Sequence, residues 1–393
     1  MIRIITGLIF LLLTNDYCFG QNNVRLVIKS SPPYQPSNSE IYLAGTCNGW
    51  NPNDKIFRFS KNDSGLYFLD MKLFKGSYEF KLTGGDWNKV ECTAKGVDIP
   101  NRKIEIDADT VISVNVEGWK DHFTNGSIKP KSTAGKNVHI LDSAFWIPQL
   151  HRKRRIWIYL PDGYATSKLK YPVLYMQDGQ NIFDDATSYS GEWGVDECLD
   201  TMIKKCIVVA IDNGLDKRLN EYCPYDFSLT GIAATYSSNK GEGNQYLDFL
   251  VKTLKPLIDK KYRTLRDKKH TFIAGSSMGG LISMYALLKY PDIFGAAGVF
   301  SPAFWVGPKI FDDILKKGNK VHSRIYFYAG GEESKTMVPD MIKAENEIKQ
   351  VSKPVDNFVS VIDSNAKHNE TAWRKQFPGF YLWLMDKKSY AIK

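Results

Sequence analysis

The stretch Thr271-Phe272-Ile273-Ala274-Gly275-Ser276-Ser277-Met278-Gly279-Gly280 decides the fold because its character changes in the middle. Its apolar start predicts a buried strand, and the segment from Gly280 to Tyr290 predicts a helix. Between them, Gly275 to Gly279 fits the pattern GxSxG. A serine on a tight strand-to-helix turn holds its hydroxyl above the sheet, and the flanking glycines allow close backbone approach. We therefore predict a nucleophile at Ser277; Ser276 is the neighbouring alternative, but it is off the centre of the motif.

Strands and helices alternate on both sides of this stretch. Further strands are predicted at 155–160, 171–176, 206–211, 297–300 and 325–328, and a helix is predicted from Tyr246 to Tyr262. Pro172 restricts its strand to starting near that residue, because proline cannot donate to a central ladder. Alternation of this kind predicts an α/β fold, with a mostly parallel sheet covered by helices on both faces.

A serine nucleophile needs a base, and only two histidines follow Ser277 in the chain. His322 precedes the strand at Ile325, at the end of the sheet remote from its carboxyl edge. His368 follows the predicted strand Phe358–Ile362, on the side where open α/β sheets place their sites. The order of nucleophile, acid and histidine along the chain therefore favours His368 as the base.

The acid that orients the histidine should lie between Ser277 and His368, at the end of a strand. Glu333, just after the strand that ends near Gly330, is the first choice. Glu332 and Asp340 remain alternatives.

Two backbone N–H groups should stabilise the oxyanion that forms during acyl transfer. One is expected from Met278, the residue after the nucleophile. The other is expected from the loop Gln177-Asp178-Gly179-Gln180-Asn181, where we favour the N–H of Gln180. Asp178 precedes the serine in the chain, so a role in forming the turn is expected for it rather than that of the acid.

The chain divides by composition into several parts. Residues 24–118 contain short β-rich segments separated by turns such as Asn48-Gly49 and Gly84-Gly85-Asp86, which predicts an immunoglobulin-like β-sandwich. Residues 119–136 are polar and small enough to form a linker, and residues 137–390 form the α/β domain.

The first 20 residues predict a secretory signal peptide. Arg3 begins it, and the apolar run Ile4–Leu13 is much shorter than the roughly 20 residues that span a bilayer. Cys18 suggests lipoprotein processing, but the residues before it are not small and apolar. No later segment predicts a membrane span, and the protein is expected to be secreted or periplasmic.

Charge and cysteine content exclude several other classes. The net charge is +9, but the basic cluster His151–Arg155 leads into an apolar strand and is expected to be a solvated strand end, and no nucleic-acid motif is present. The cysteines are widely spread without a CxxC pair, so neither a metal site nor a disulfide framework is predicted.

The α/β part resembles the putative-esterase family of α/β-hydrolases, which includes esterase D, feruloyl esterases and enterochelin-type esterases. The resemblance covers roughly residues 137 to 390. It rests on 171–175, 178–181, 275–280, 301–305, 330–333 and 368–370. It implies hydrolysis of carboxylic esters through an acyl-enzyme, without metal or cofactor. Many members use aspartate as the acid. A glutamate at 333 keeps the charge, but its side chain has a different reach.

The N-terminal part resembles starch- and glycogen-binding sandwich modules. The resemblance rests on Ala44–Pro52, Tyr78–Leu82, Trp87, Glu91 and Pro100–Arg102. It implies that Trp50 and Trp87 stack on sugar rings, whose C–H faces suit an aromatic surface. Alternatively, one or both tryptophans belong to the core.

Together these features predict a secreted serine carboxylic ester hydrolase acting on acyl or feruloyl esters of polysaccharide. Two alternatives stay open. One is an esterase that opens siderophore lactones of the enterochelin type. The other is a carbohydrate-binding protein with a degenerate hydrolase domain.

Overall fold

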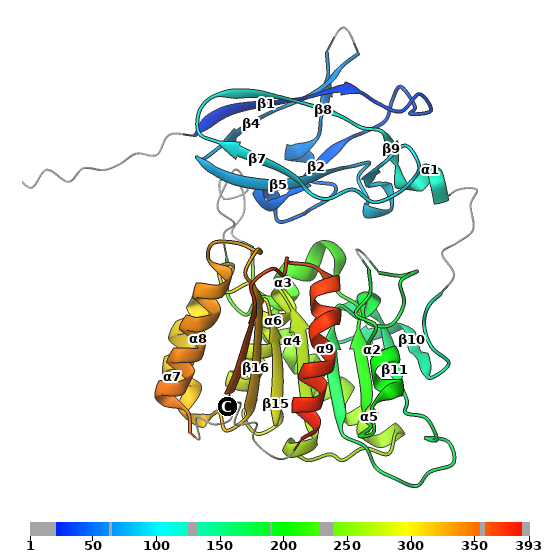
Figure 1. The fold of residues 1–393 in the computed structure, drawn as a ribbon, viewed down its shortest axis with the longest axis vertical. Coiled ribbons are helices and arrows are strands. Elements are labelled where there is room, and N and C mark those ends of the chain that lie inside the picture. Colours follow the sequence, from blue (N-terminus) through cyan, green and yellow to red (C-terminus); the bar gives the residue numbers. More distant parts are fainter. Residues whose placement is uncertain are drawn as a thin grey trace, which may run out of the picture. The chain divides into compact units, whose positions relative to one another are not determined.

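The computed structural model describes residues 21–62, 65–124, 132–188, 191–227, 239–353 and 358–386. The predicted signal peptide lies outside the described residues. The chain separates into two compact units, with the division between Gly126 and Ser127 (Figure 1). In the described part of the chain, no helix has the length and apolarity needed to cross a bilayer.

The first unit is β-rich with antiparallel sheets, as predicted. One sheet has the order β3-β4-β1-β8, a second the order β2-β5-β7, and β6 pairs with β9. All pairs are antiparallel except β1 with β8. Their apolar faces enclose one core that includes Leu26, Leu69, Phe80 and Leu82. The elements are β1 (Asn22–Ser30), β2 (Tyr42–Gly45), β3 (Ser60–Lys61), β4 (Tyr67–Leu73), β5 (Gly76–Thr83), β6 (Glu91–Cys92), β7 (Arg102–Ile106), β8 (Thr110–Asn115), β9 (Gly118–Trp119) and α1 (Lys120–Thr124).

Ordered structure of this unit continues past residue 118, into the stretch predicted as a linker. Trp119 pairs with Glu91 and is buried in the core, and α1 follows it. The indole Nε1 of Trp119 donates to Gln35 Oε1 at 2.7 Å. A single buried tryptophan in a polar stretch therefore extends the unit beyond its predicted end, while residues 125–131 of the stretch lie outside the described residues.

The second unit contains the predicted sheet, in the order β10-β11-β13-β12-β14-β15-β16-β17. Strands β12 to β17 run parallel to one another, whereas β11 is antiparallel to both β10 and β13 and so forms an antiparallel edge with β10. The strands are β10 (Val138–Ile147), β11 (Arg152–Tyr159), β12 (Val173–Gln177), β13 (Ile207–Ile211), β14 (Thr271–Ser276), β15 (Ala296–Phe300), β16 (Arg324–Gly330) and β17 (Phe358–Asp363). The expected α/β-hydrolase fold is confirmed.

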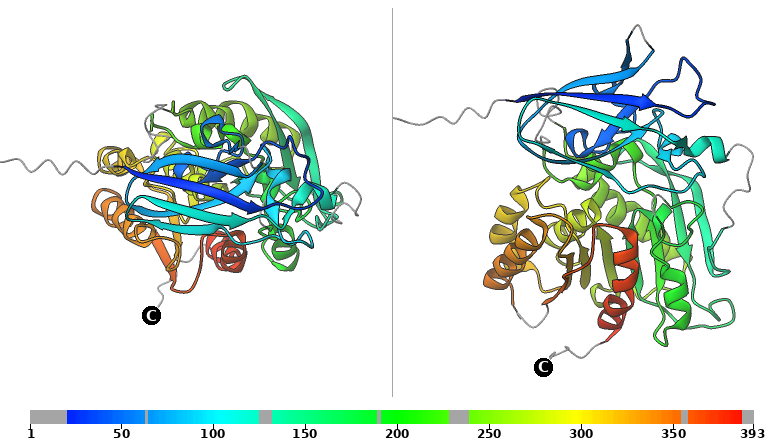
Figure 2. Two further views of the ribbon diagram at one scale, coloured as in Figure 1. Left: turned by 90° about the horizontal axis from the view of Figure 1, so that it is seen from above. Right: turned by 45° about the horizontal axis from the view of Figure 1, so that its top comes forward.

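Helices cover both faces of this sheet, and the central strands are therefore buried along their whole length. Alternate residues such as Phe272 and Ala274 of β14 pack into a core that contains α2 and α9, which lie side by side (Figures 1 and 2). Helix α6 packs on β14 and β15. The helices are α2 (Val195–Thr201), α3 (Arg218–Tyr222), α4 (Gly243–Phe249), α5 (Lys255–Lys261), α6 (Met278–Lys289), α7 (Lys309–Lys317), α8 (Met337–Val351) and α9 (Glu370–Met385).

The helix predicted from Tyr246 to Tyr262 contains an irregular turn. Helix α4 passes into a π-helical turn at Leu250–Leu254, and α5 follows. Pro256 lies in the first turn of α5 and has no N–H to offer the preceding turn. A π turn at this point keeps the helix continuous while the hydrogen-bond pattern shifts.

The arginines of the basic cluster at the start of β11 are partly buried and form an ion-pair network, so the expectation of a solvated strand end is wrong for them, whereas His151 and Lys153 are exposed. Arg152 and Arg154 both pair with Glu221, whose side chain is fully buried. Arg155 pairs with Asp212 at 2.9 Å. Glu221 lies in α3, 67 residues after Arg154, so the partner could not be recognised from the local sequence.

We predict that Glu221→Gln lowers the free energy of unfolding of the second unit by about 3 kcal/mol, because it leaves Arg154 buried without its counter-charge. Urea denaturation followed by circular dichroism measures the loss. Asp216→Asn breaks an exposed pair with Lys217 and serves as the control, with an expected change below about 0.5 kcal/mol. A loss below about 1 kcal/mol in Glu221→Gln would show that the network carries little stability.

Candidate active site

The predicted nucleophile lies at the junction of β14 and α6. Ser277 has φ 58° and ψ −120°, a backbone conformation that few non-glycine residues adopt. It is half-buried, whereas the residues on either side of it are buried. A Cβ on Gly275 would lie 3.0 Å from the backbone of Gly279, so the glycines of the motif permit the tight turn. The local sequence thus produces the strained turn that the motif predicts.

Four residues of interest follow the carboxyl ends of four neighbouring parallel strands. Ser277 follows β14, Ser301 follows β15, Glu333 comes soon after β16, and His368 comes soon after β17. Parallel strands end at the same edge of a sheet, which gathers these residues although they are far apart in sequence. Backbone hydrogen bonds connect Ser277 with the segment around Ser301. Ser277 N donates to Phe300 O at 2.9 Å, and Ala303 N donates to Ser277 O at 3.0 Å.

Glu333 lies against His368, and its side chain is only 1% exposed. Its Oε2 lies 2.6 Å from Nδ1 of His368. Its Oε1 accepts from Ser301 Oγ and from the N–H of Gly330, both at 2.6 Å. The carboxylate is thus saturated with partners, one of which is the imidazole.

The alternatives for base and acid lie elsewhere. His322 precedes β16, and its Nδ1 contacts the carbonyl of Lys353 at 2.9 Å. Glu332 is exposed and lies 4.0 Å from Lys367, and Asp340 is in the first turn of α8. Among the described residues, none of the three forms a hydrogen bond or an ion pair with His368.

The two expected oxyanion donors lie in the first turns of helical segments that follow the neighbouring strands β14 and β12. Met278 is the first residue of α6, and Gln180 is in a 3₁₀ turn, Gly179–Asn181, directly after β12. Strand β12 neighbours β14 in the sheet. N–H groups in the first turn of a helix have no acceptor within that helix, so both can donate to a ligand.

Several polar residues that sequence reasoning missed support this edge. Trp373 of α9 donates from Nε1 to Ser301 Oγ at 2.9 Å, and its ring meets the ring of His368 edge-on at 5.0 Å. Asp178 forms a bidentate pair with Arg218, with distances of 2.7 and 2.9 Å. Ser301 belongs to the stretch 301–305 that carries the family resemblance, so the sequence indicated one partner of the contact with Trp373. No local sequence pattern indicated Trp373 or Arg218.

Glu370 is a second carboxyl group close to His368. Burial raises its pKa to about 6. Its Oε1 accepts from Asn181 Nδ2 at 3.1 Å, which joins the start of α9 to the loop that carries Gln180. Glu370 thus contributes to the polar setting of His368, two residues before it.

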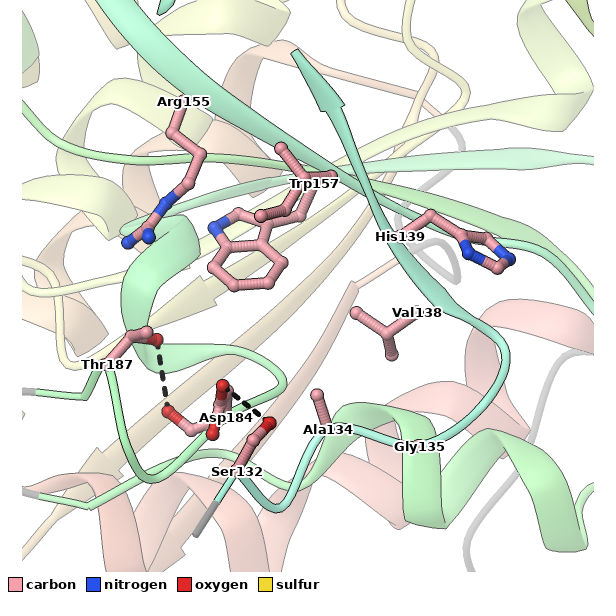
Figure 3. A pocket seen from close by; sticks show the side chains of 10 residues that line it. Ser132, Ala134, Gly135, Val138, His139, Arg155, Trp157, Asp184 and Thr187 are labelled. Carbon is pink, nitrogen blue, oxygen red and sulfur yellow. Dashed lines mark hydrogen bonds between the residues drawn. The ribbon is translucent and has the colours of Figure 1, made fainter. Parts of the chain in front are cut away.

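A separate groove of about 680 Å³ lies at the antiparallel edge of the sheet (Figure 3). His139 of β10 and Arg155 and Trp157 of β11 line it, together with Asp184. Asp184 accepts from Ser132 Oγ at 2.9 Å. None of the residues gathered around Ser277 lines this groove.

In the first unit, the two tryptophans expected to meet a sugar are neighbours. Their ring centroids lie 6.3 Å apart at 33°, and both residues are half-buried. Trp50 has φ 62° and follows a turn held by Asn48, whose side chain bonds Gly45 N and Leu43 O at 2.8 Å each. Trp87 opens the 3₁₀ turn Trp87–Lys89. Neither is a fully buried core residue.

The second unit is similar in sequence to known proteins. The family model described as Putative esterase matches residues 147–384. YbbA of Bacillus subtilis, an uncharacterised protein, is 28% identical over 249 residues, which are 60% of this chain and 93% of that protein. An endo-1,4-beta-xylanase/feruloyl esterase of Xylanibacter ruminicola is 25% identical over 245 residues, 60% of this chain and 30% of that one.

One solved structure is similar along nearly the whole chain. The enterochelin esterase of Shigella flexneri matches with a TM-score of 0.51 and 14% identity, covering 92% of this chain and 90% of its own. At this level of identity the likeness concerns the fold.

Proposed function

This chain belongs to the Putative esterase family, and on that premise we propose that it is a secreted serine carboxylic ester hydrolase. Ser277 is the nucleophile, His368 the general base and Glu333 the acid. The observation that carries this proposal is the contact of 2.6 Å between the buried carboxylate of Glu333 and His368, at the same sheet edge as the strained Ser277. Membership of the family makes the protein an esterase; the serine mechanism and the secretion are our proposal, and secretion rests on residues 1–20.

In the proposed reaction, the hydroxyl oxygen of Ser277 attacks the ester carbonyl carbon while its proton passes to His368. The N–H groups of Met278 and Gln180 stabilise the negative oxygen of the tetrahedral intermediate. The bond to the alcohol oxygen then breaks, and that oxygen takes the proton from His368. Water, deprotonated by the same imidazole, attacks the acyl carbon. The bond from that carbon to Ser277 Oγ then breaks, Ser277 takes the proton back from His368, and the carboxylic acid product leaves. Glu333 stays ionised and compensates the charge of the imidazolium.

We predict that Ser277→Ala lowers the turnover of p-nitrophenyl acetate by at least about 10⁴-fold, because no other group can form the acyl-enzyme. Ser276→Ala, one residue away, is the matched control and should keep most of the activity. Steady-state absorbance assays measure both, with circular dichroism to verify folding. Undiminished turnover in Ser277→Ala would contradict the nucleophile, and an inactive wild-type chain would favour a degenerate hydrolase domain.

The substrates we propose are acyl or feruloyl esters of polysaccharide. A relative that matches 60% of this chain is named a feruloyl esterase. In this chain, Trp305 lies in the loop after β15 and is 50% exposed, and Ala303 of the same loop bonds the backbone of Ser277. An exposed indole this close in sequence to the nucleophile's contact offers an apolar face to an aromatic acyl group. Siderophore lactones with catecholate groups are the alternative, because they also carry aromatic acyl groups.

We therefore predict that Trp305→Ala lowers kcat/KM for methyl ferulate by about 10-fold, consistent with the loss of an aromatic contact of about 1.4 kcal/mol. The value for p-nitrophenyl acetate should change less, because its acyl group is small. Trp146→Ala removes an equally exposed tryptophan from β10 and is the control. A wild-type chain that hydrolyses a catecholate lactone faster than feruloyl and acetylated-sugar esters would overturn the polysaccharide assignment.

For the first unit we propose binding of an α-glucan through Trp50 and Trp87. Two half-exposed indoles with centroids 6.3 Å apart can contact adjacent faces of a sugar chain. This binding would hold the esterase near its polysaccharide substrate and raise the local substrate concentration.

We predict that the full chain is retained on amylose resin and that Trp50→Ala and Trp87→Ala each reduce the retention several-fold. Phe74→Ala, which removes another partly exposed aromatic residue of the same unit, is the control. Affinity electrophoresis in soluble starch gives a second measure. Lack of retention by the unaltered chain would identify the unit as a spacer.

A further inference from the structure

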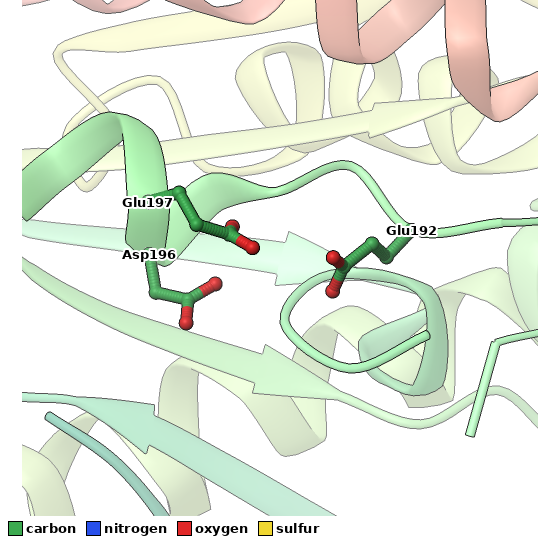
Figure 4. A group of neighbouring side chains, drawn as sticks. All are labelled: Glu192, Asp196 and Glu197. Carbon is green, nitrogen blue, oxygen red and sulfur yellow. The ribbon is translucent and has the colours of Figure 1, made fainter. Parts of the chain in front are cut away.

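Three acidic side chains meet at the start of α2, and none of them is a proposed catalytic residue. Asp196 and Glu197 belong to the helix and Glu192 to the segment before it, and their carboxylates point toward one another (Figure 4). One oxygen from each of the three lies within 4.8 Å of the others. Carboxylates at this spacing repel one another unless a proton or a cation lies between them.

Burial makes this arrangement costly. Asp196 is 1% exposed and Glu192 is 5% exposed. Asp196 Oδ1 and Glu192 Oε2 are both buried and have no hydrogen-bond partner among the described residues. Buried carboxylate oxygens of native proteins normally have partners, so these two indicate a missing ligand.

The groups around the cluster compensate only part of its charge. Arg374 of α9 lies 3.2 Å from Glu192 and 3.7 Å from Glu197. The N–H of Gly135 donates to Asp196 Oδ2 at 2.7 Å. When all three carboxylates are ionised, a single guanidinium leaves two negative charges without compensation. A divalent cation would neutralise them.

We propose that Glu192, Asp196 and Glu197 bind one Ca²⁺ ion. The donors are all carboxylate oxygens without histidine or cysteine, a set that selects a hard cation. Ca²⁺ accepts irregular arrangements with water completing its shell, whereas Mg²⁺ demands a regular octahedron. The exposed side chain of Glu197 leaves one side of the cluster open to such water.

The proposed ion lies next to residues that support the base. Trp193 follows Glu192 directly, and its ring packs against Trp373 with centroids 5.7 Å apart. Trp373 in turn contacts His368 and Ser301. A cation that ties Glu192 to α2 therefore holds Trp193 beneath this part of the site, and its main effect is on the stability of the folded second unit.

The test is Ca²⁺ binding by the full chain after removal of metals with EDTA. Isothermal titration calorimetry should show one Ca²⁺ per chain, with weaker binding of Mg²⁺. The melting temperature should rise by about 5–10 °C when free Ca²⁺ is about 100 times the dissociation constant. Both measurements are independent of ester turnover, so they stand or fall separately from the proposed catalytic mechanism.

Variants identify the site. Glu197→Gln changes an exposed residue and should fold, yet it should weaken Ca²⁺ binding by at least about 10-fold. Asp196→Asn should abolish the thermal shift. Asp292→Asn, in an exposed turn after α6, should behave like the unaltered chain. Ca²⁺ binding that is unchanged in Glu197→Gln, or a melting temperature indifferent to Ca²⁺, would overturn the proposal; the latter would mean that the carboxyl groups share protons instead.

Discussion

The buried carboxylate of Glu333 is the group on which the arrangement around His368 depends. Removing a carboxylate from water costs several kcal/mol, and the cost is offset only when its oxygens find donors. Here Oε1 accepts from Ser301 and Gly330, and Oε2 faces the imidazole. Because each of these partners comes from the end of a different strand or its loop, the Glu333 carboxylate links the loops after β15, β16 and β17. The imidazole is held in one orientation as a result.

The same requirement extends into the core beneath the loops. Ser301 has φ 43° and is fully buried, so its hydroxyl is positioned by the backbone rather than by a free rotation toward solvent. It donates to Glu333 and accepts from Trp373, whose ring packs on Trp193. Aromatic packing between α9 and the sheet thus determines where the Glu333 carboxylate can lie. A substitution in this packing could in this way displace the His368 imidazole.

How much of this could be predicted from the sequence depends on the range of each interaction. The turn at Ser277 depends on local residues, because glycines two residues away on each side permit it. A short sequence motif is therefore enough to predict it. The order of strands along the chain was enough to bring His368 and Glu333 to one edge. The contact of Trp373 with Ser301 spans 72 residues, and that of Arg154 with Glu221 spans 67, so neither leaves a local pattern. The misjudged basic cluster is the clearest example, since its sequence shows only the positive half of the network.

Buried carboxylates in the second unit differ in how much of their negative charge is compensated by cations of the chain. This difference indicates different roles for them. Asp178 meets the guanidinium of Arg218 with both oxygens, and Glu221 lies between two arginines. The charge of both is compensated by cations of the chain, although Glu221 Oε2 also has no hydrogen-bond partner among the described residues. Asp196 and Glu192 each retain a buried oxygen without a partner among the described residues, beside a third carboxylate. Since folding normally pairs such groups, the uncompensated cluster is best explained by a partner that is not part of the chain, and an ion with two positive charges meets both the charge and the oxygen donors.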